Sequence, residues 1–103
     1  MTESEFAALG VEMIDGIEDA IDATDINADI DRKAEGVLEI GLAGGKIVVN
    51  MQVPMRQIWV AAKSGGFHFA LESGRWQDTR SGEPLMDLLS RVVSAQAGVD
   101  ARL

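Results

Sequence analysis

The stretch that decides the fold lies between residues 50 and 61 and reads Asn50-Met51-Gln52-Val53-Pro54-Met55-Arg56-Gln57-Ile58-Trp59-Val60-Ala61. In its second half Ile58 and Val60 share one face, and Gln57, Trp59 and Ala61 share the other. A period of two is typical of a strand with one buried face. Pro54 cannot donate a ladder hydrogen bond, so the preceding strand must end near it. The stretch therefore predicts a strand, a turn and a second strand.

The same alternation extends in both directions and is interrupted by turns that contain glycine. Upstream, we expect a polar edge strand over residues 29–34, followed by two strands whose inward residues are Leu38, Ile40, Leu42, Ile47, Val49 and Met51. Downstream, one strand carries Phe67, Phe69 and Leu71, and a short last strand carries Trp76. The pattern predicts an antiparallel meander of five to six strands.

Helical periodicity flanks the meander on both sides. Residues 4–22 predict a helix with Ser4 as N-cap, and its apolar stripe is Phe6, Leu9, Met13, Ile17 and Ile21. Residues 83–96 predict a second helix with Pro84 in its first turn, and its inward positions are Leu85, Leu88, Leu89, Val92 and Gln96. The predicted fold class is α+β: a two-layer sandwich of helix, meander and helix, forming one domain over residues 1–103.

Charge is distributed very unevenly along the chain. Residues 1–31 hold ten acids and no Lys or Arg, whereas the rest of the chain holds seven acids and nine bases. The net charge of −8 argues against nucleic acid, because phosphate binding needs positive charge. A cation or a partner with a basic surface suits this balance better. No apolar run approaches the roughly 20 residues of a membrane helix, and the acidic N-terminus resembles no targeting segment, so we expect the cytoplasm.

Several kinds of site are excluded by the residues themselves. The chain has no cysteine, so a metal site must use oxygen ligands or the single histidine, His68. Residues 25–36 begin like an EF-hand loop, but Ile30 stands where glycine is required and Gly36 where the bidentate glutamate belongs. Residues 40–47 lack the first glycine and the hydroxyl residue of a P-loop. No nucleophile has a partner base, so the sequence carries no enzyme signature.

Two groups of polar residues remain as candidates. Acids on the first helix and just after it form what we call the acidic ridge: Asp15, Glu18, Asp19, Asp22, Asp25, Asp29 and Asp31. Hard cations accept such ligands, although an exposed site binds weakly, and the alternative is an acidic face that only maintains solubility. Strand alternation predicts a second group on the uncovered sheet face, the tryptophan face: Asn50, Gln57, Trp59 and His68. An outward Trp59 is either an interface anchor or a cover for neighbouring strands.

The sequence resembles the frataxin family, in its bacterial branch. Residues 50–61 match that family's pattern N-x-Q-x-P-x-x-Q-x-W-x-A, residues 64–69 and 80–83 follow in family order, and residues 4–6 and 29–31 precede it. The resemblance implies a sandwich in which both helices cover one sheet face. It also implies an iron-binding regulator of iron–sulfur cluster assembly that modulates cysteine desulfurase. Presenting iron to the scaffold protein is a competing description, and a ferroxidase-type enzyme or an iron-storage protein is the alternative.

By position, the resemblance assigns weakly bound ferrous and ferric iron to Glu18, Asp19, Asp22, Asp25, Asp29 and Asp31. It assigns desulfurase docking to the ridge, including Asp15, and places Asn50, Gln57 and Trp59 toward the scaffold. Close bacterial relatives usually carry acids at the positions of Ala23, Asn27 and Lys33. We therefore expect fewer or weaker cation sites here, with Glu18, Asp19 and Asp22 primary, and a monomer in the absence of iron. A generic acidic interaction module without a metal role is the remaining alternative.

Overall fold

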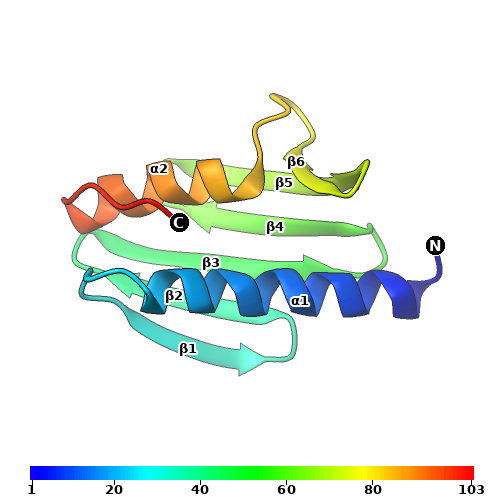
Figure 1. Ribbon diagram of the computed structural model, residues 1–103, viewed down its shortest axis with the longest axis horizontal. Coiled ribbons are helices and arrows are strands. Elements are labelled where there is room, and N and C mark those ends of the chain that lie inside the picture. Colours follow the sequence, from blue (N-terminus) through cyan, green and yellow to red (C-terminus); the bar gives the residue numbers. More distant parts are fainter.

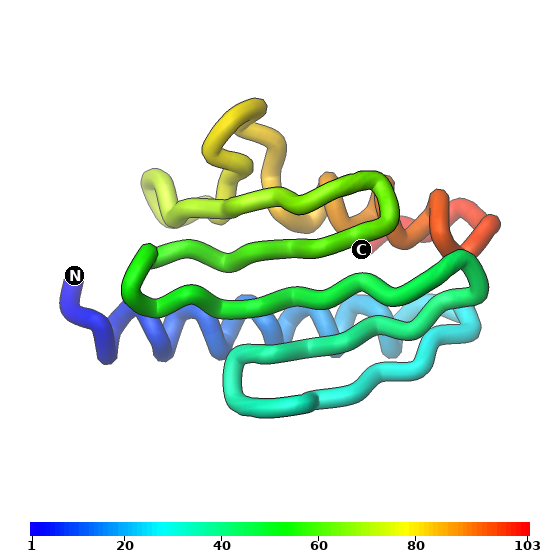
Figure 2. Tube along the Cα trace, turned by 180° about the vertical axis from the view of Figure 1, so that it is seen from behind, coloured from blue at the N-terminus to red at the C-terminus, as the bar shows by residue number.

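The structure is a computed structural model that describes all 103 residues. Its elements follow the order α1 (Glu3–Asp22), β1 (Asp29–Ala34), β2 (Val37–Leu42), β3 (Gly45–Gln52), β4 (Gln57–Ala62), β5 (Gly65–Glu72), β6 (Arg75–Asp78) and α2 (Leu85–Ala97). Both helices run along one face of the sheet (Figure 1), and the view from behind shows the strands in front of them (Figure 2). The predicted two-layer α+β sandwich is confirmed.

The sheet is an antiparallel meander of six strands in sequence order. The predicted edge strand over residues 29–34 has those bounds in the structure. Turns that contain or adjoin a glycine separate the strands as predicted, except between β3 and β4, where the turn contains Pro54 and no glycine. Across β3, β4 and β5, Val49 pairs with Val60 and Val60 with Phe67, whereas Asn50 pairs with Trp59 and Trp59 with His68. The residues between positions 50 and 61 thus fix the register that separates the core face from the outer face.

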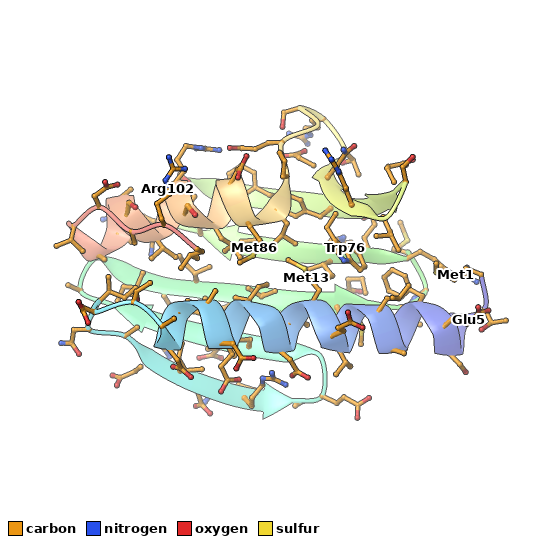
Figure 3. The ribbon with its side chains drawn as sticks, viewed as in Figure 1. Met1, Glu5, Met13, Trp76, Met86 and Arg102 are labelled. Carbon is orange, nitrogen blue, oxygen red and sulfur yellow. The ribbon has the colours of Figure 1, made fainter.

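The core lies between the helices and the sheet. It contains the predicted inward residues of the strands except the half-buried Leu71, the apolar inward residues of α2 and residues of α1. Its fully buried members include Ile14, Ile17, Leu38, Ile40, Ile47, Val49, Ile58, Val60, Phe69, Leu88 and Leu89. The side chains of Met13, Trp76 and Met86 extend from α1, β6 and α2 into the space between the two helices (Figure 3), and all three pack against the core. Apolar burial on one sheet face leaves the other face to polar side chains.

Helix α1 differs from the prediction in its cap and its stripe. The N-cap is Thr2, not Ser4: Thr2 Oγ1 accepts from the Glu5 backbone N–H at 3.1 Å, and Glu5 Oε1 accepts from the Thr2 N–H at 2.9 Å. Only Thr2 has a glutamate three residues later, so only Thr2 can form this capping box. Leu9, predicted to be buried, is 36% exposed, while Gly10 and Ile14 are buried. The stripe is rotated because Gly10 lets the helix approach Met51 on β3.

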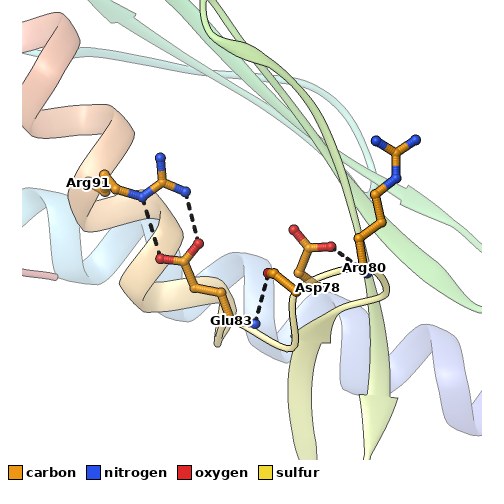
Figure 4. A network of polar contacts seen from close by, with 5 residues as sticks. Asp78, Arg80, Glu83 and Arg91 are labelled. Carbon is orange, nitrogen blue, oxygen red and sulfur yellow. Dashed lines mark hydrogen bonds and ion pairs between the residues drawn. The ribbon is translucent and has the colours of Figure 1, made fainter.

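Helix α2 begins two residues later than predicted. Pro84 is its N-cap and not part of its first turn, and the preceding segment is fixed by side-chain contacts (Figure 4). Arg91 donates to Glu83 at 2.8 Å, and this hydrogen bond raises the pKa of Arg91. The Arg80 backbone N–H donates to Asp78 Oδ1 at 2.8 Å. These contacts give the segment at residues 80–83 a structural role. Neither α1 nor α2 is long and apolar enough to cross a lipid bilayer.

The capping box makes the start of α1 sensitive to pH. Hydrogen bonds from Thr2, the backbone N–H above all, lower the pKa of Glu5. A carboxyl whose pKa is lower in the folded state adds stability above its unfolded pKa and loses it as the pH falls through the folded pKa. We therefore expect Glu5→Gln to lower the melting temperature at pH 7 but not at pH 3. Glu3→Gln, in the same turn but outside the box, is the control; an equal pH-dependent loss there would contradict the assignment.

Candidate functional site

The acidic ridge follows the second half of α1 and continues through the connecting loop into β1. Asp15, Asp19, Asp22, Asp25, Asp29 and Asp31 are exposed, and Glu18 is half-buried. The helical members stand three and four residues apart, so they share one side of the helix. This side of the helix therefore faces solvent at Asp15, Asp19 and Asp22, and Glu18 lies partly covered.

Glu18 is covered because Arg32 of β1 crosses to the helix. Arg32 Nη2 lies 2.6 Å from Asp15 Oδ1, and Arg32 Nε lies 3.0 Å from Glu18 Oε1. The hydrogen bond to Asp15, aided by the charge of Glu18, raises the pKa of Arg32. Sequence reasoning did not identify Arg32 as part of the site. The available signal was alternation, because Arg32 stands two residues after the apolar Ile30 and so faces the helices.

The same alternation separates the β1 acids from the helical ones. Ile30 packs against the core, and Arg32 pairs in register with the fully buried Leu38. Asp29 and Asp31 therefore point to the opposite side of this edge strand. There Asp31 forms a 3.0 Å ion pair with Lys33, and its hydrogen bond raises the pKa of Lys33. The ridge thus wraps around the edge of the sheet.

The structure does not bring the six predicted iron ligands into one chelating group. No three acidic or histidine side chains are arranged closely enough to enclose a metal ion. Of the ridge members, Asp15, Glu18 and Asp31 have an ion-pair partner, and Asp19, Asp22, Asp25 and Asp29 have none. Such a donor set fits a hard cation that keeps most of its water, bound by one or two carboxylates.

The unpaired acids coincide with the negative end of a helix dipole. The last turn of α1 contains no basic residue, and it holds Asp19 and Asp22. Carboxylates at a helix C-terminus are unfavourable by roughly 0.3–1 kcal/mol each, because the free carbonyl groups there are also negative. Asp25 lies in the loop immediately beyond. This end of α1 therefore combines unpaired carboxylates with the negative end of the helix dipole, an arrangement that favours cations and basic surfaces.

The tryptophan face has the predicted composition. The Trp59 and His68 rings stack with centroids 4.4 Å apart and an angle of 12°, and Trp59 Nε1 donates to Gln57 Oε1 at 2.8 Å. Asn50 lies on the other side of Trp59, in register with it. Trp59 therefore packs on His68, and its half-exposed ring is held in one orientation. A preorganised aromatic ring loses little entropy on binding a partner.

A cleft of about 810 Å³ lies at the end of the molecule where α1 leads into β1. Asp25 and Asp29 of the ridge contribute to its wall, and Lys46 and Arg102 lie there with them. The floor is formed by apolar residues such as Ile26 and Leu42. The cleft thus carries both signs of charge, and its acidic side is continuous with the ridge.

Comparison with known proteins agrees with this architecture. The model of the frataxin-like domain matches residues 1–99. A solved structure of frataxin from Psychromonas ingrahamii superposes with a TM-score of 0.90 at 28% identity, covering 99% of this chain and 97% of that one. A trimeric frataxin from the yeast Saccharomyces cerevisiae, in complex with ferrous iron, gives a TM-score of 0.67 at 29% identity, covering 95% and 88%. The chain belongs to the frataxin-like family.

Bacterial relatives indicate the branch within that family. The iron–sulfur cluster assembly protein CyaY of Ralstonia nicotianae is 48% identical, covering 100% of this chain and 95% of the relative. The protein of the same name from Cupriavidus pinatubonensis is 45% identical, covering 100% and 96%. The predicted resemblance to bacterial frataxins is therefore confirmed.

Proposed function

We propose that this protein is an iron-binding regulator of iron–sulfur cluster assembly that modulates the activity of cysteine desulfurase. The observation that carries the proposal is the group of unpaired carboxylates at the C-terminal end of α1, Asp19, Asp22 and Asp25, next to a helix end with no compensating base. Names of the bacterial relatives support the pathway, and the yeast frataxin with ferrous iron supports the cargo.

Iron is the cargo of this surface and not a resident cofactor. Exposed carboxylates that do not form a cage bind a hydrated divalent or trivalent cation weakly, and they discriminate poorly between metals. The primary contacts we propose are Asp19 and Asp22, which have no ion-pair partner, and Asp25, Asp29 and Asp31 form the continuation of the site. Glu18, expected from the sequence to be a primary contact with them, is held by Arg32 and lies at the border of the site. Weak binding suits a protein that responds to the free iron concentration, because its occupancy then changes with supply.

We propose the same ridge, including Asp15, as the docking surface for a basic face of cysteine desulfurase. Surface charges of opposite sign guide association and make the affinity dependent on salt. The tryptophan face, with Asn50, Gln57 and Trp59, is proposed to lie toward the scaffold protein. The fixed Trp59 ring supports this, since aromatic anchors are enriched at the centres of interfaces. Presenting iron to that scaffold is compatible with the same two surfaces.

An anaerobic titration of Fe²⁺ into isotope-labelled protein tests the cation site. Paramagnetic broadening of amide signals is expected first at residues 15–31, strongest near Asp19 and Asp22, because unpaired carboxylates are concentrated there. The titration is repeated with the variant Asp19→Asn/Asp22→Asn, for which we expect about tenfold weaker binding, since two of the charged ligands are lost. Glu72→Asn/Asp87→Asn removes the same charge elsewhere and is the control. Broadening centred outside residues 15–31 would contradict the proposal.

Measurements on the parent protein and its variants also distinguish the alternative functions. A ferroxidase predicts repeated turnover of Fe²⁺ under oxygen that is lost on replacing Glu18 and Asp22. An iron-storage protein predicts many ions bound per chain and oligomers that grow with the iron load. A generic acidic module predicts that the ridge binds iron no better than a scrambled acidic peptide. The proposed regulator predicts none of these results, and instead a change in desulfurase rate that depends on iron.

A further inference from the structure

Arg32 places a positive charge on the acidic ridge from within the protein. Its guanidinium group bridges two residues of α1 that precede it by 17 and 14 positions, with 2.6 Å to Asp15 and 3.0 Å to Glu18. The two contacts use different nitrogen atoms of the guanidinium group, Nη2 for Asp15 and Nε for Glu18. A planar group with several donors satisfies two carboxylates at once, which a lysine cannot do in the same way.

The fold fixes where this charge lies. Arg32 pairs with Leu38 on the face of β1 that is turned to the helices, and Ile30 on the same face packs against the core. The Arg32 side chain is only 35% exposed, so α1 and β1 confine it. The other base of this strand, Lys33, pairs with Asp31 instead. Arg32 is therefore the one base in contact with the helical part of the ridge.

We infer that Arg32 is an internal competitor for cations at the ridge and confines their binding to its unpaired end. The inference rests on the proposed function, that the ridge binds cations. A metal ion that approached Asp15 or Glu18 would have to displace a charged hydrogen bond and would meet the repulsion of the guanidinium group. Asp19, Asp22, Asp25 and Asp29 carry no such charge. Arg32 thus limits both the number of ridge carboxylates open to iron and the affinity of the site.

The test compares Fe²⁺ binding, measured anaerobically with the metal alone, in the parent chain and in Arg32→Gln. In the parent we expect broadening that is centred on Asp19 and Asp22 and is weakest, among the helical ridge residues, at the side-chain carboxyl signals of Asp15 and Glu18. In Arg32→Gln we expect it to include them, with an affinity about fivefold higher, because a like charge a few ångströms from the ion is removed. Lys63→Gln, in the turn between β4 and β5, removes the same net charge far from the helix and should change the affinity less than about twofold.

Arg32→Lys serves as a second variant, which retains the positive charge but loses the planar guanidinium group. Since an ammonium group lacks the fixed planar geometry that holds both carboxylates, it should hold them less firmly and give an intermediate affinity. Identical ridge-centred maps and affinities in the parent and Arg32→Gln would overturn the inference and leave the proposed function standing. An equal gain in Lys63→Gln would also overturn it, because net charge alone would then explain the effect. Broadening away from residues 15–31 in every variant would instead remove the proposed function and the inference together.

Discussion

The double replacement Asp19→Lys/Asp22→Lys is expected to weaken binding of cysteine desulfurase by about 100-fold, equivalent to roughly 2.8 kcal/mol. Both residues are exposed on the side of α1 that carries the ridge, and neither has an ion-pair partner within the chain. Each reversal replaces an attraction to a basic surface with a repulsion of similar size. The dissociation constant is measured by titration calorimetry at two salt concentrations, and the parent affinity should fall as ionic strength rises.

The same variant should be as stable as the parent or more stable, which separates lost docking from lost folding. Lysines at the C-terminal end of α1 complement the helix dipole, and they remove the repulsion between Asp19 and its neighbours on the helix. We expect the free energy of unfolding to rise by roughly 0.5–1 kcal/mol. Such a gain would mean that the ridge carboxylates lower the free energy of unfolding while they provide a binding surface, as residues of functional surfaces often do.

The control for net charge is Glu72→Lys/Asp87→Lys, which makes the same change at two exposed positions on β5 and α2. Its desulfurase affinity should stay within about threefold of the parent, because the altered charges lie away from the ridge. Equal weakening in both double variants would show that overall charge, and not the ridge, determines binding. Unchanged affinity of the ridge variant would remove the ridge from the docking surface.

Strand alternation predicted the sheet closely, whereas the buried stripe of α1 needed tertiary information. Ile58 and Val60 specify the core face of β4, and a shift of one residue would expose both, so the sequence leaves little choice of register. On α1, by contrast, Leu9 and Ile14 are both apolar, and only the position of the helix over the sheet decides which one is buried. The Thr2–Glu5 spacing was a usable signal for the N-cap, and it was missed.

In the candidate site, too, some features could be predicted from the sequence and others depend on tertiary contacts. The acidic ridge could be predicted from the sequence, because the excess of acids in residues 1–31 is independent of the fold. The contact between Arg32 and Asp15 depends on how the loop from residue 23 to residue 28 places β1 against α1, and no local pattern encodes that distance. A metal ion at the proposed site would therefore meet an arrangement that composition alone does not describe, in which carboxylates paired with Arg32 lie beside unpaired carboxylates. The sequence predicts the candidate ligands, and tertiary contacts decide which of them remain available.

Gln96→Ala is expected to cost about 3 kcal/mol of unfolding free energy, the largest loss we predict from a polar residue. Sequence periodicity placed Gln96 on the inward face of α2, and the structure shows why a polar residue belongs there. Its Nε2 donates to the Gly45 carbonyl at 3.0 Å, and its Oε1 accepts from the Lys63 backbone N–H at 2.8 Å. Removing the amide leaves both part-buried backbone groups without their protein partner, at about 1–3 kcal/mol each.

The backbone of Gln96 adds a third hydrogen bond between α2 and the turns of the two hairpins that its side chain contacts. The Gly44 N–H donates to the Gln96 carbonyl at 2.7 Å, and a Cβ on Gly44 would lie 2.5 Å from that oxygen. Gly44→Ala should therefore also destabilise the protein, by about 2 kcal/mol, since a backbone atom cannot move aside cheaply. Gln52→Ala truncates a half-buried glutamine on β3 that forms no side-chain hydrogen bond, and it should cost less than about 1 kcal/mol. Denaturant unfolding with a common slope measures all three variants, and equal losses in Gln96→Ala and Gln52→Ala would show that the amide contacts of Gln96 contribute nothing specific.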